Sequence, residues 1–234
     1  MTMKNSVFLL FGCIFSTLIA TAQVPDEDQL GAWYMYFYNA NFKDSNWGIQ
    51  GDFQYRDWRG LGDREQLLLR SGITYEPINS GVKVTLGYAN ITTGQYGTAI
   101  DAPVSESRVY QEALFSNTLL QRLLLTHRFR YEQRWVDQQD FRTRYRYNLF
   151  INIPLKGKTL QKGTPYLAFY NEIFINGERK IGNDRSVPFF DRNRTYLGIG
   201  YAFFEKMRFQ LGWMKQTTEA WQKGQLQFSV HHTF

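Results

Sequence analysis

The chain has 234 residues, of which 43% are hydrophobic and 17% aromatic, so length and composition permit one folded domain. Its single cysteine excludes a disulfide scaffold, and no apolar run after residue 22 approaches the roughly 20 residues of a membrane helix. The formal net charge of +6 is basic, but the arginines are dispersed among apolar residues, which argues against nucleic-acid binding.

The N-terminal segment has the features of a secretory signal peptide. Lys4 precedes an apolar run, Val7–Ala20, that ends in the small-residue cleavage pattern Ala20-Thr21-Ala22. We predict a cleaved signal peptide over residues 1–22 and one barrel domain over residues 23–234. A lipoprotein signal at Leu10–Cys13 is the competing interpretation, but it leaves an apolar region shorter than the usual roughly 7–15 residues.

Two-residue alternation of apolar and polar side chains recurs from Leu30 to Phe234, without a long helical period or an internal repeat. Eleven segments carry this β-strand pattern: about 30–42, 47–58, 65–76, 82–93, 108–118, 121–136, 141–153, 165–176, 190–203, 207–217 and 225–234. Bacterial single-chain membrane barrels have even strand numbers. The odd count therefore suggests a missed or merged strand, and we predict about 10–12 strands.

The clearest pattern is a hairpin around Asp137–Asp140. The first arm places apolar residues on one parity: Leu123, Leu125, His127, Phe129, Tyr131 and Trp135. The second arm continues this apolar face with Phe141, Tyr145, Tyr147, Leu149, Ile151 and Ile153. Arginines dominate the opposite face of both arms, so the hairpin has one apolar and one strongly basic face.

The connections alternate in length along the chain. Short turns alternate with longer, polar, glycine-bearing loops such as Gly94–Ser107 and Gly177–Phe189, as in outer-membrane barrels. Two connections break the alternation, because Asp137–Asp140 is short where a long loop is expected and Leu155–Thr164 is long where a short one is expected. We predict an all-β fold, a single antiparallel transmembrane β-barrel of about 10–12 strands, with the long loops outside the cell.

Periodicity alone does not show which face points outward. Three other features indicate that the polar face lines the lumen and the apolar face meets lipid. The polar face carries acids and arginines that can form a network within a narrow lumen: Asp52, Arg56, Arg70, Glu112, Arg128, Arg130, Glu132, Arg134, Arg142, Arg144, Arg146, Glu172, Arg194 and Arg208. Aromatic residues lie toward strand ends, as in membrane girdles, among them Trp33, Trp47, Trp58 and Trp213. The last strand alternates and closes on Phe234, which resembles the C-terminal barrel-assembly signal of outer-membrane proteins.

Several short motifs resemble an uncharacterised outer-membrane family, domain of unknown function 2490. They are Leu30-Gly31-Ala32-Trp33, Gln54-Tyr55-Arg56, Arg128-Phe129-Arg130-Tyr131-Glu132-Gln133-Arg134, Asn171-Glu172 and Arg194-Thr195-Tyr196-Leu197-Gly198. The resemblance covers nearly the whole mature chain. It implies an exported barrel without an assigned activity, and it supplies no catalytic residues.

The sequence gives little support for catalysis. Ser229 and His231 share the lumen parity two residues apart, which allows a nucleophile and a base side by side, but no third member is identifiable. His127 and His232 fall on the lipid parity. Without a mature cysteine or an H-x-x-x-H pattern we expect no metal, and we expect no cofactor. We therefore expect no enzyme activity and assign no catalytic residue.

The arginine-rich face allows two interpretations. It can attract anionic solutes or lipid phosphates, or its arginines can pair with Glu112, Glu132 and Glu172 and fill the lumen. Barrels of about eight strands are filled by side chains, whereas open channels need about sixteen. Filling is therefore the favoured interpretation.

We predict an outer-membrane β-barrel of the Gram-negative cell envelope, structural or serving limited passage or binding of anionic solutes. Its expected partners are outer-membrane lipid and, during insertion, the barrel-assembly machinery; we expect a monomer and no nucleic acid. Two alternatives stay open. One is an outer-membrane lipid-modifying enzyme that hydrolyses or transfers acyl chains, and the other is a soluble exported barrel that binds a hydrophobic ligand.

Overall fold

The structure is a computed structural model that describes residues 25–97 and 102–234, so the predicted signal peptide lies outside the described residues. Within those ranges the chain forms eleven strands and no helix. The strands are β1 (Gly31–Asn41), β2 (Trp47–Asp57), β3 (Arg64–Tyr75), β4 (Val82–Thr93), β5 (Val104–Leu119), β6 (Leu123–Val136), β7 (Arg142–Pro154), β8 (Pro165–Asn176), β9 (Phe190–Phe204), β10 (Met207–Thr217) and β11 (Gln222–Thr233). The part of the chain described contains no helix long and apolar enough to cross a membrane.

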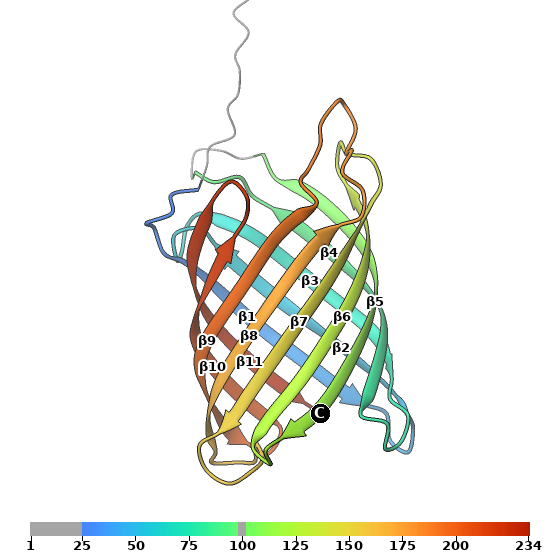
Figure 1. The fold of residues 1–234 in the computed structure, drawn as a ribbon, viewed down its shortest axis with the longest axis vertical. Coiled ribbons are helices and arrows are strands. Elements are labelled where there is room, and N and C mark those ends of the chain that lie inside the picture. The colour runs from blue at the N-terminus through green and yellow to red at the C-terminus, as the bar shows by residue number, and fades with distance from the viewer. Residues whose placement is uncertain (1–24, 98–101) are drawn as a thin grey trace, which may run out of the picture.

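The strands close into a single barrel in which each strand pairs with its neighbours in the chain, and β1 pairs with β11 (Figure 1). The predicted all-β barrel is confirmed. All pairs are antiparallel except β1 and β11, which run parallel from Gly31 opposite Gln225 to Asn39 opposite Thr233. Strand directions alternate around a barrel, so an odd number of strands forces one parallel pair. The expectation of a missed or merged strand was therefore wrong, since the chain closes with eleven.

The two ends of the barrel differ. The segment before β1 and the connections after β2, β4, β6, β8 and β10 lie at one end, here called the loop end. The C-terminus and the connections after β1, β3, β5, β7 and β9 lie at the other, here called the turn end (Figure 1). The short β6–β7 connection contacts the long β8–β9 loop, since Asp140 N donates to Ile181 O at 3.0 Å.

Alternate side chains of each strand point outward and inward, and the outward set is apolar. Leu197 and Ile199 are each 62% exposed. The same exposed face includes Phe53, Leu69, Ile73, Leu86, Phe115, Phe129, Phe209, Leu211 and Phe228. The barrel thus has its apolar surface outside and its charged residues inside, the reverse of a water-soluble domain.

Two of the predicted girdle aromatics do not lie on the outer surface. Trp33 is 2% exposed and points into the lumen, and Trp58 is buried between loops at the loop end. Both fall at strand ends in the sequence, but Trp33 is on the lumen parity, as its contact with lumen arginines shows. By contrast Trp47 and Trp213 are about half exposed on the outer face.

Inward tyrosines pack on glycines of the neighbouring strand. Tyr110 lies opposite Gly87, where an added Cβ would be 2.2 Å from the ring, and Tyr166 lies over Gly200 in the same way. Only glycine permits such flat packing of a ring on the backbone. These in-strand glycines therefore make room for the tyrosine rings.

Candidate functional site

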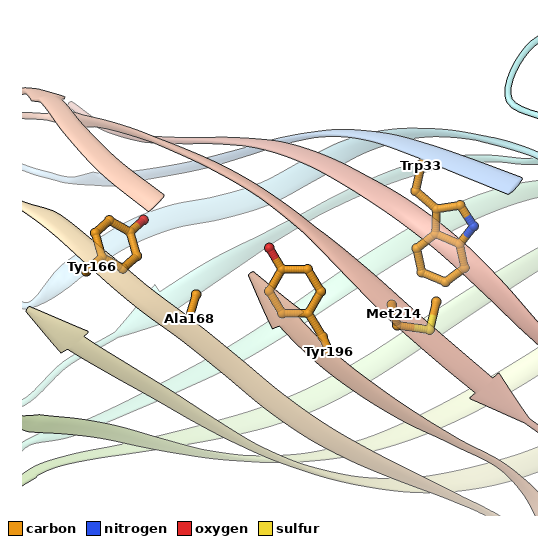
Figure 2. Close-up of a cluster of buried hydrophobic side chains, with 5 residues drawn as sticks. All are labelled: Trp33, Tyr166, Ala168, Tyr196 and Met214. Atoms are coloured by element: carbon orange, nitrogen blue, oxygen red, sulfur yellow. The ribbon is translucent and has the colours of Figure 1, made fainter. Parts of the chain in front are cut away.

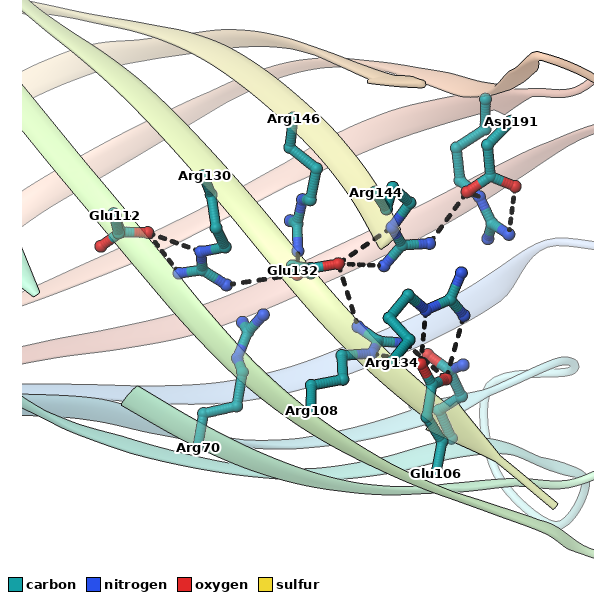
Figure 3. A network of polar contacts seen from close by, with 12 residues as sticks. Arg70, Glu106, Arg108, Glu112, Arg130, Glu132, Arg134, Arg144, Arg146 and Asp191 are labelled. Carbon is teal, nitrogen blue, oxygen red and sulfur yellow. Dashed lines mark hydrogen bonds and ion pairs between the residues drawn. The ribbon is translucent and has the colours of Figure 1, made fainter. Parts of the chain in front are cut away.

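The lumen is crossed by a network of ion pairs built mainly on β5, β6 and β7 (Figure 3). At its centre Glu132 is 1% exposed and lies 2.6 Å from both Arg144 Nη2 and Arg146 Nη1. Register explains the first contact, because Glu132 and Arg144 are opposite each other on β6 and β7. Arg108 and Arg130 approach the same carboxylate at 3.7 and 3.9 Å.

The network continues from Glu132 in both directions along the lumen. Arg144 also contacts Asp191 at 2.8 Å, and Arg146 contacts Glu172 at 2.6 Å. Arg128 contacts both Glu172 and Glu112, and Glu112 also binds Arg130. Glu106 binds Arg108 and Arg134 in a further cluster. A connected set of this kind compensates most of the buried charges and links strands that are distant in sequence.

Two lumen arginines use aromatic rings and amides instead of carboxylates. The guanidinium carbons of Arg56 and Arg194 lie 3.7 and 4.7 Å from the centre of the Trp33 ring. The indole N–H of Trp33 donates to Glu65 at 2.8 Å. Such stacking favours a cation on an aromatic face when water is excluded. These two arginines are therefore held inside the barrel without an ion pair among the described residues.

The opposite part of the lumen wall contains a cluster of buried hydrophobic side chains. Figure 2 shows Trp33, Tyr166, Ala168, Tyr196 and Met214 pointing into the barrel from β1, β8, β9 and β10. Each of these residues is less than 5% exposed. The lumen thus has a charged side and an aromatic side.

The loop end of the lumen is covered by aromatic residues and the segment before β1. Trp58 packs edge-on against Tyr96 and Trp221, with ring centres 5.9 and 6.2 Å apart. Lys223 extends from β11 and donates to the carbonyl of Asp26 at 2.6 Å. Together with the ion pairs beneath them, these contacts close the loop end.

The turn end of the lumen is hollow. A cavity of about 440 Å³ extends from the network to the rim, where it is bordered by Asn39, Lys83, Ser116 and Thr233. These residues belong to the turn-end portions of four different strands. The lumen is therefore filled in its loop-end half and hollow in its turn-end half. We call the hollow half the turn-end cavity.

All fourteen charged residues predicted to face the lumen lie inside the barrel, and twelve of them are buried. Arg128 and Arg208 are the partly exposed members, and both line the turn-end cavity. Arg134 pairs with Glu106 rather than with the glutamates expected from the sequence. Sequence reasoning missed further charged members of the interior, among them Glu65, Glu106, Arg108 and Asp191. Glu106 and Arg108 follow the inward parity of β5, whereas Glu65 and Asp191 lie at register shifts of β3 and β9, where alternation does not reveal an inward side chain.

The structure brings Ser229 and His231 together in the turn-end cavity, with Ser229 Oγ 3.2 Å from His231 Nε2. The His231 ring stacks on Phe37, with ring centres 4.8 Å apart. No carboxylate contacts this histidine among the described residues. His127 and His232 instead pair on the outer face with Tyr147 and Tyr36 hydroxyls, each at 2.8 Å.

Two carboxylates at the loop end are held by protein donors. Glu178 accepts from the Thr143 hydroxyl at 2.8 Å, and Asp191 is held by Arg144 and Arg192. Residues 25–97 and 102–234 contain no group of three or more His, Cys, Asp or Glu side chains arranged for a metal ion.

Fold and site together define a closed β-barrel with an apolar exterior and a charged lumen, partly filled by its own side chains. The chain belongs to the family described as protein of unknown function DUF2490, whose model matches residues 30–227. This confirms the family resemblance seen in the sequence motifs. No curated protein matches the chain.

Proposed function

We propose that this protein is an integral outer-membrane β-barrel. The observation that carries the proposal is the inverted distribution of side chains, with exposed leucine, isoleucine and phenylalanine outside and buried ion pairs inside. Strands of 11–16 residues are long enough for the roughly 9–11 residues that a tilted strand needs to cross a bilayer. A soluble barrel that binds a hydrophobic ligand needs an apolar interior, whereas a buried network of charged side chains crosses this lumen.

Within the membrane, we propose that the barrel binds anionic solutes from the turn end and is not an open channel. The ion pairs around Glu132 and the cover formed by Trp58 and Lys223 close the loop end. The turn-end cavity remains accessible and is lined by arginines. A monomer in contact with outer-membrane lipid, inserted by the barrel-assembly machinery, is sufficient for this role.

Membrane fractionation followed by electrophoresis of boiled and unboiled samples tests the location. The proposal predicts recovery in the outer-membrane fraction and a boiling-dependent shift in migration. A detergent-free soluble protein without the shift would contradict it. Planar-bilayer recording then tests the closed lumen, since a barrel filled near Glu132 should give no steady open-channel current at moderate voltage.

A lipid-modifying enzyme is the second candidate, and the 3.2 Å contact between Ser229 and His231 is the observation that favours it. In this reaction His231 would accept the Ser229 proton as the serine oxygen attacks an ester carbonyl, and would give it to the alcohol that leaves when the ester C–O bond breaks. Water would then hydrolyse the acyl-serine, release the fatty acid and restore Ser229. Phospholipid ester hydrolysis by the folded barrel, lost in His231→Ala with the heat-dependent shift retained, would establish it. Equal activity of the variant and the parent would exclude this dyad.

A further inference from the structure

The turn-end cavity carries more positive than negative side chains. Its cationic lining residues are Arg70, Lys83, Arg128, Arg130, Arg146, Arg194 and Arg208. Its acidic lining residues are Asp52, Glu112 and Glu172. Seven cations against three anions leave a formal excess of four, and counting Glu132 and Glu76, which pair with Arg146 and Lys83 from outside the lining, still leaves two. A low-dielectric wall strengthens the attraction of such an excess for an anion.

The cationic side chains of this cavity are incompletely paired. Arg208 forms no ion pair within the described parts of the chain and lies opposite His231 on the neighbouring strand. At the inner end, Arg130 Nη1 and Arg128 Nε lack a hydrogen-bond partner and have only longer ion-pair contacts, 3.9 Å to Glu132 and 3.7 Å to Glu112. Arg208 is therefore able to pair with the oxygen atoms of a bound anion, and Arg128 and Arg130 add positive charge to the same cavity.

The other wall of the cavity is apolar and aromatic. Met35 and Phe37 enter from β1, and Tyr170 stacks on Tyr196 with ring centres 4.9 Å apart. Phe150 lies beneath the guanidinium of Arg128, 5.1 Å from ring centre to carbon. An inorganic anion would leave this wall unused, whereas a ligand with an apolar body would cover it.

We infer that the turn-end cavity binds a small anionic amphiphile, a carboxylate or phosphate monoester joined to an apolar or aromatic body. The anionic group lies among Arg208, Arg128 and Arg130, and the apolar body lies against the aromatic wall. A volume of about 440 Å³ is within the roughly 300–1,000 Å³ range of ligand pockets. The inference rests on the proposed function, because it takes the turn end as the accessible side of a membrane barrel.

Calorimetric titration of the purified barrel in neutral detergent tests this, with 1-naphthyl phosphate and 1-naphthoate as probes. Both should bind saturably, inorganic phosphate at least about tenfold more weakly, and 1-naphthylmethylammonium not at all. Equal binding of inorganic phosphate would overturn the apolar component. Equal binding of the cation would overturn the anion site.

Arg208→Gln should weaken both naphthyl anions by at least about tenfold, because one charge-assisted contact is lost. Lys206→Gln is the matched control, since Lys206 is a cation at the same end that does not line the cavity. Should Arg208→Gln fail to fold, Thr126→Phe narrows the cavity without altering its charge and should also abolish binding. Unchanged affinity in a folded cavity variant would overturn the site.

The source of the ligand is resolved in phosphatidylcholine vesicles containing the barrel. The test adds dodecyl phosphate to the bilayer and measures its competition with 1-naphthyl phosphate. Competition supports a single-chain lipid as the source, whereas absence of competition supports a free solute. Failure of the two proposals is distinguishable. A barrel that shows the heat-dependent shift but binds no naphthyl anion overturns this inference alone, and a protein without the shift overturns the membrane function.

Discussion

Glu132 on β6 and Arg146 on β7 form an ion pair of 2.6 Å inside the barrel, and the carboxylate is 1% exposed. Three further guanidiniums lie within 4 Å of the same carboxylate. Removing one partner of a buried pair costs more than the pair contributes, because the remaining charge stays desolvated. Glu132 is therefore the residue on which the filled half of the lumen depends.

Glu132→Gln should lower the free energy of unfolding by about 3–5 kcal/mol. The reason is that the neutral amide leaves Arg144 and Arg146 buried beside a group without charge. Urea titration in detergent, followed by the heat-dependent shift, measures this loss. Glu219→Gln, in an exposed loop, is the control and should change stability by less than about 0.5 kcal/mol. Equal effects of the two variants would show that the network contributes little.

Packing of Tyr110 on Gly87 provides a second test. Gly87→Ala should destabilise the barrel by about 1–3 kcal/mol, because the new Cβ would lie 2.2 Å from the ring. In the Tyr110→Ala background the same glycine substitution should cost less than about 0.5 kcal/mol. A double-mutant cycle of unfolding free energies measures the difference. Additive effects would mean that the ring does not require this glycine.

Parallel pairing of β1 and β11 predicts the topology of the chain. Asp28 precedes β1 at the loop end, together with Lys180 of the β8–β9 loop, whereas Lys162 lies at the turn end. Single-cysteine variants at these positions should divide into two groups on labelling of intact cells with an impermeant maleimide. Asp28→Cys and Lys180→Cys should give the same labelling result, either both labelled or both protected. Lys162→Cys should give the opposite result. Asp28→Cys behaving like Lys162→Cys would contradict the eleven-strand closure.

The terminal aromatic predicts a defect in assembly rather than in stability. Phe234 is 58% exposed, its N–H donates to Asn39 O at 2.9 Å, and its ring contacts His232. Deleting Phe234 should reduce the folded fraction in membranes severalfold while refolded protein keeps its urea midpoint within experimental error. Thr233→Ala is the control for a change at the same end. An equal loss of stability in the purified protein would indicate a structural role instead.

Much of the strand pattern followed from the sequence, because two-residue alternation is a local property of an extended chain. The segments predicted around 47–58, 82–93 and 207–217 agree with β2, β4 and β10 to within a residue. β5 begins at Val104, four residues before its predicted start, because Ser105 pairs with Thr92 across the sheet. Such an extension depends on a partner strand, so its own residues do not reveal it.

The sequence by itself determined the class of fold, the family, and the set of charged residues that share one face. The sequence also predicted that this face lies inside, whereas tertiary structure decided that β1 closes on β11 in parallel and that Arg134 binds Glu106. Tertiary structure also placed Trp33 between arginines and left the turn end hollow. The physical reason is that alternation specifies faces along one strand, whereas closure, ion pairing and cavities depend on the stagger between strands that are distant in sequence.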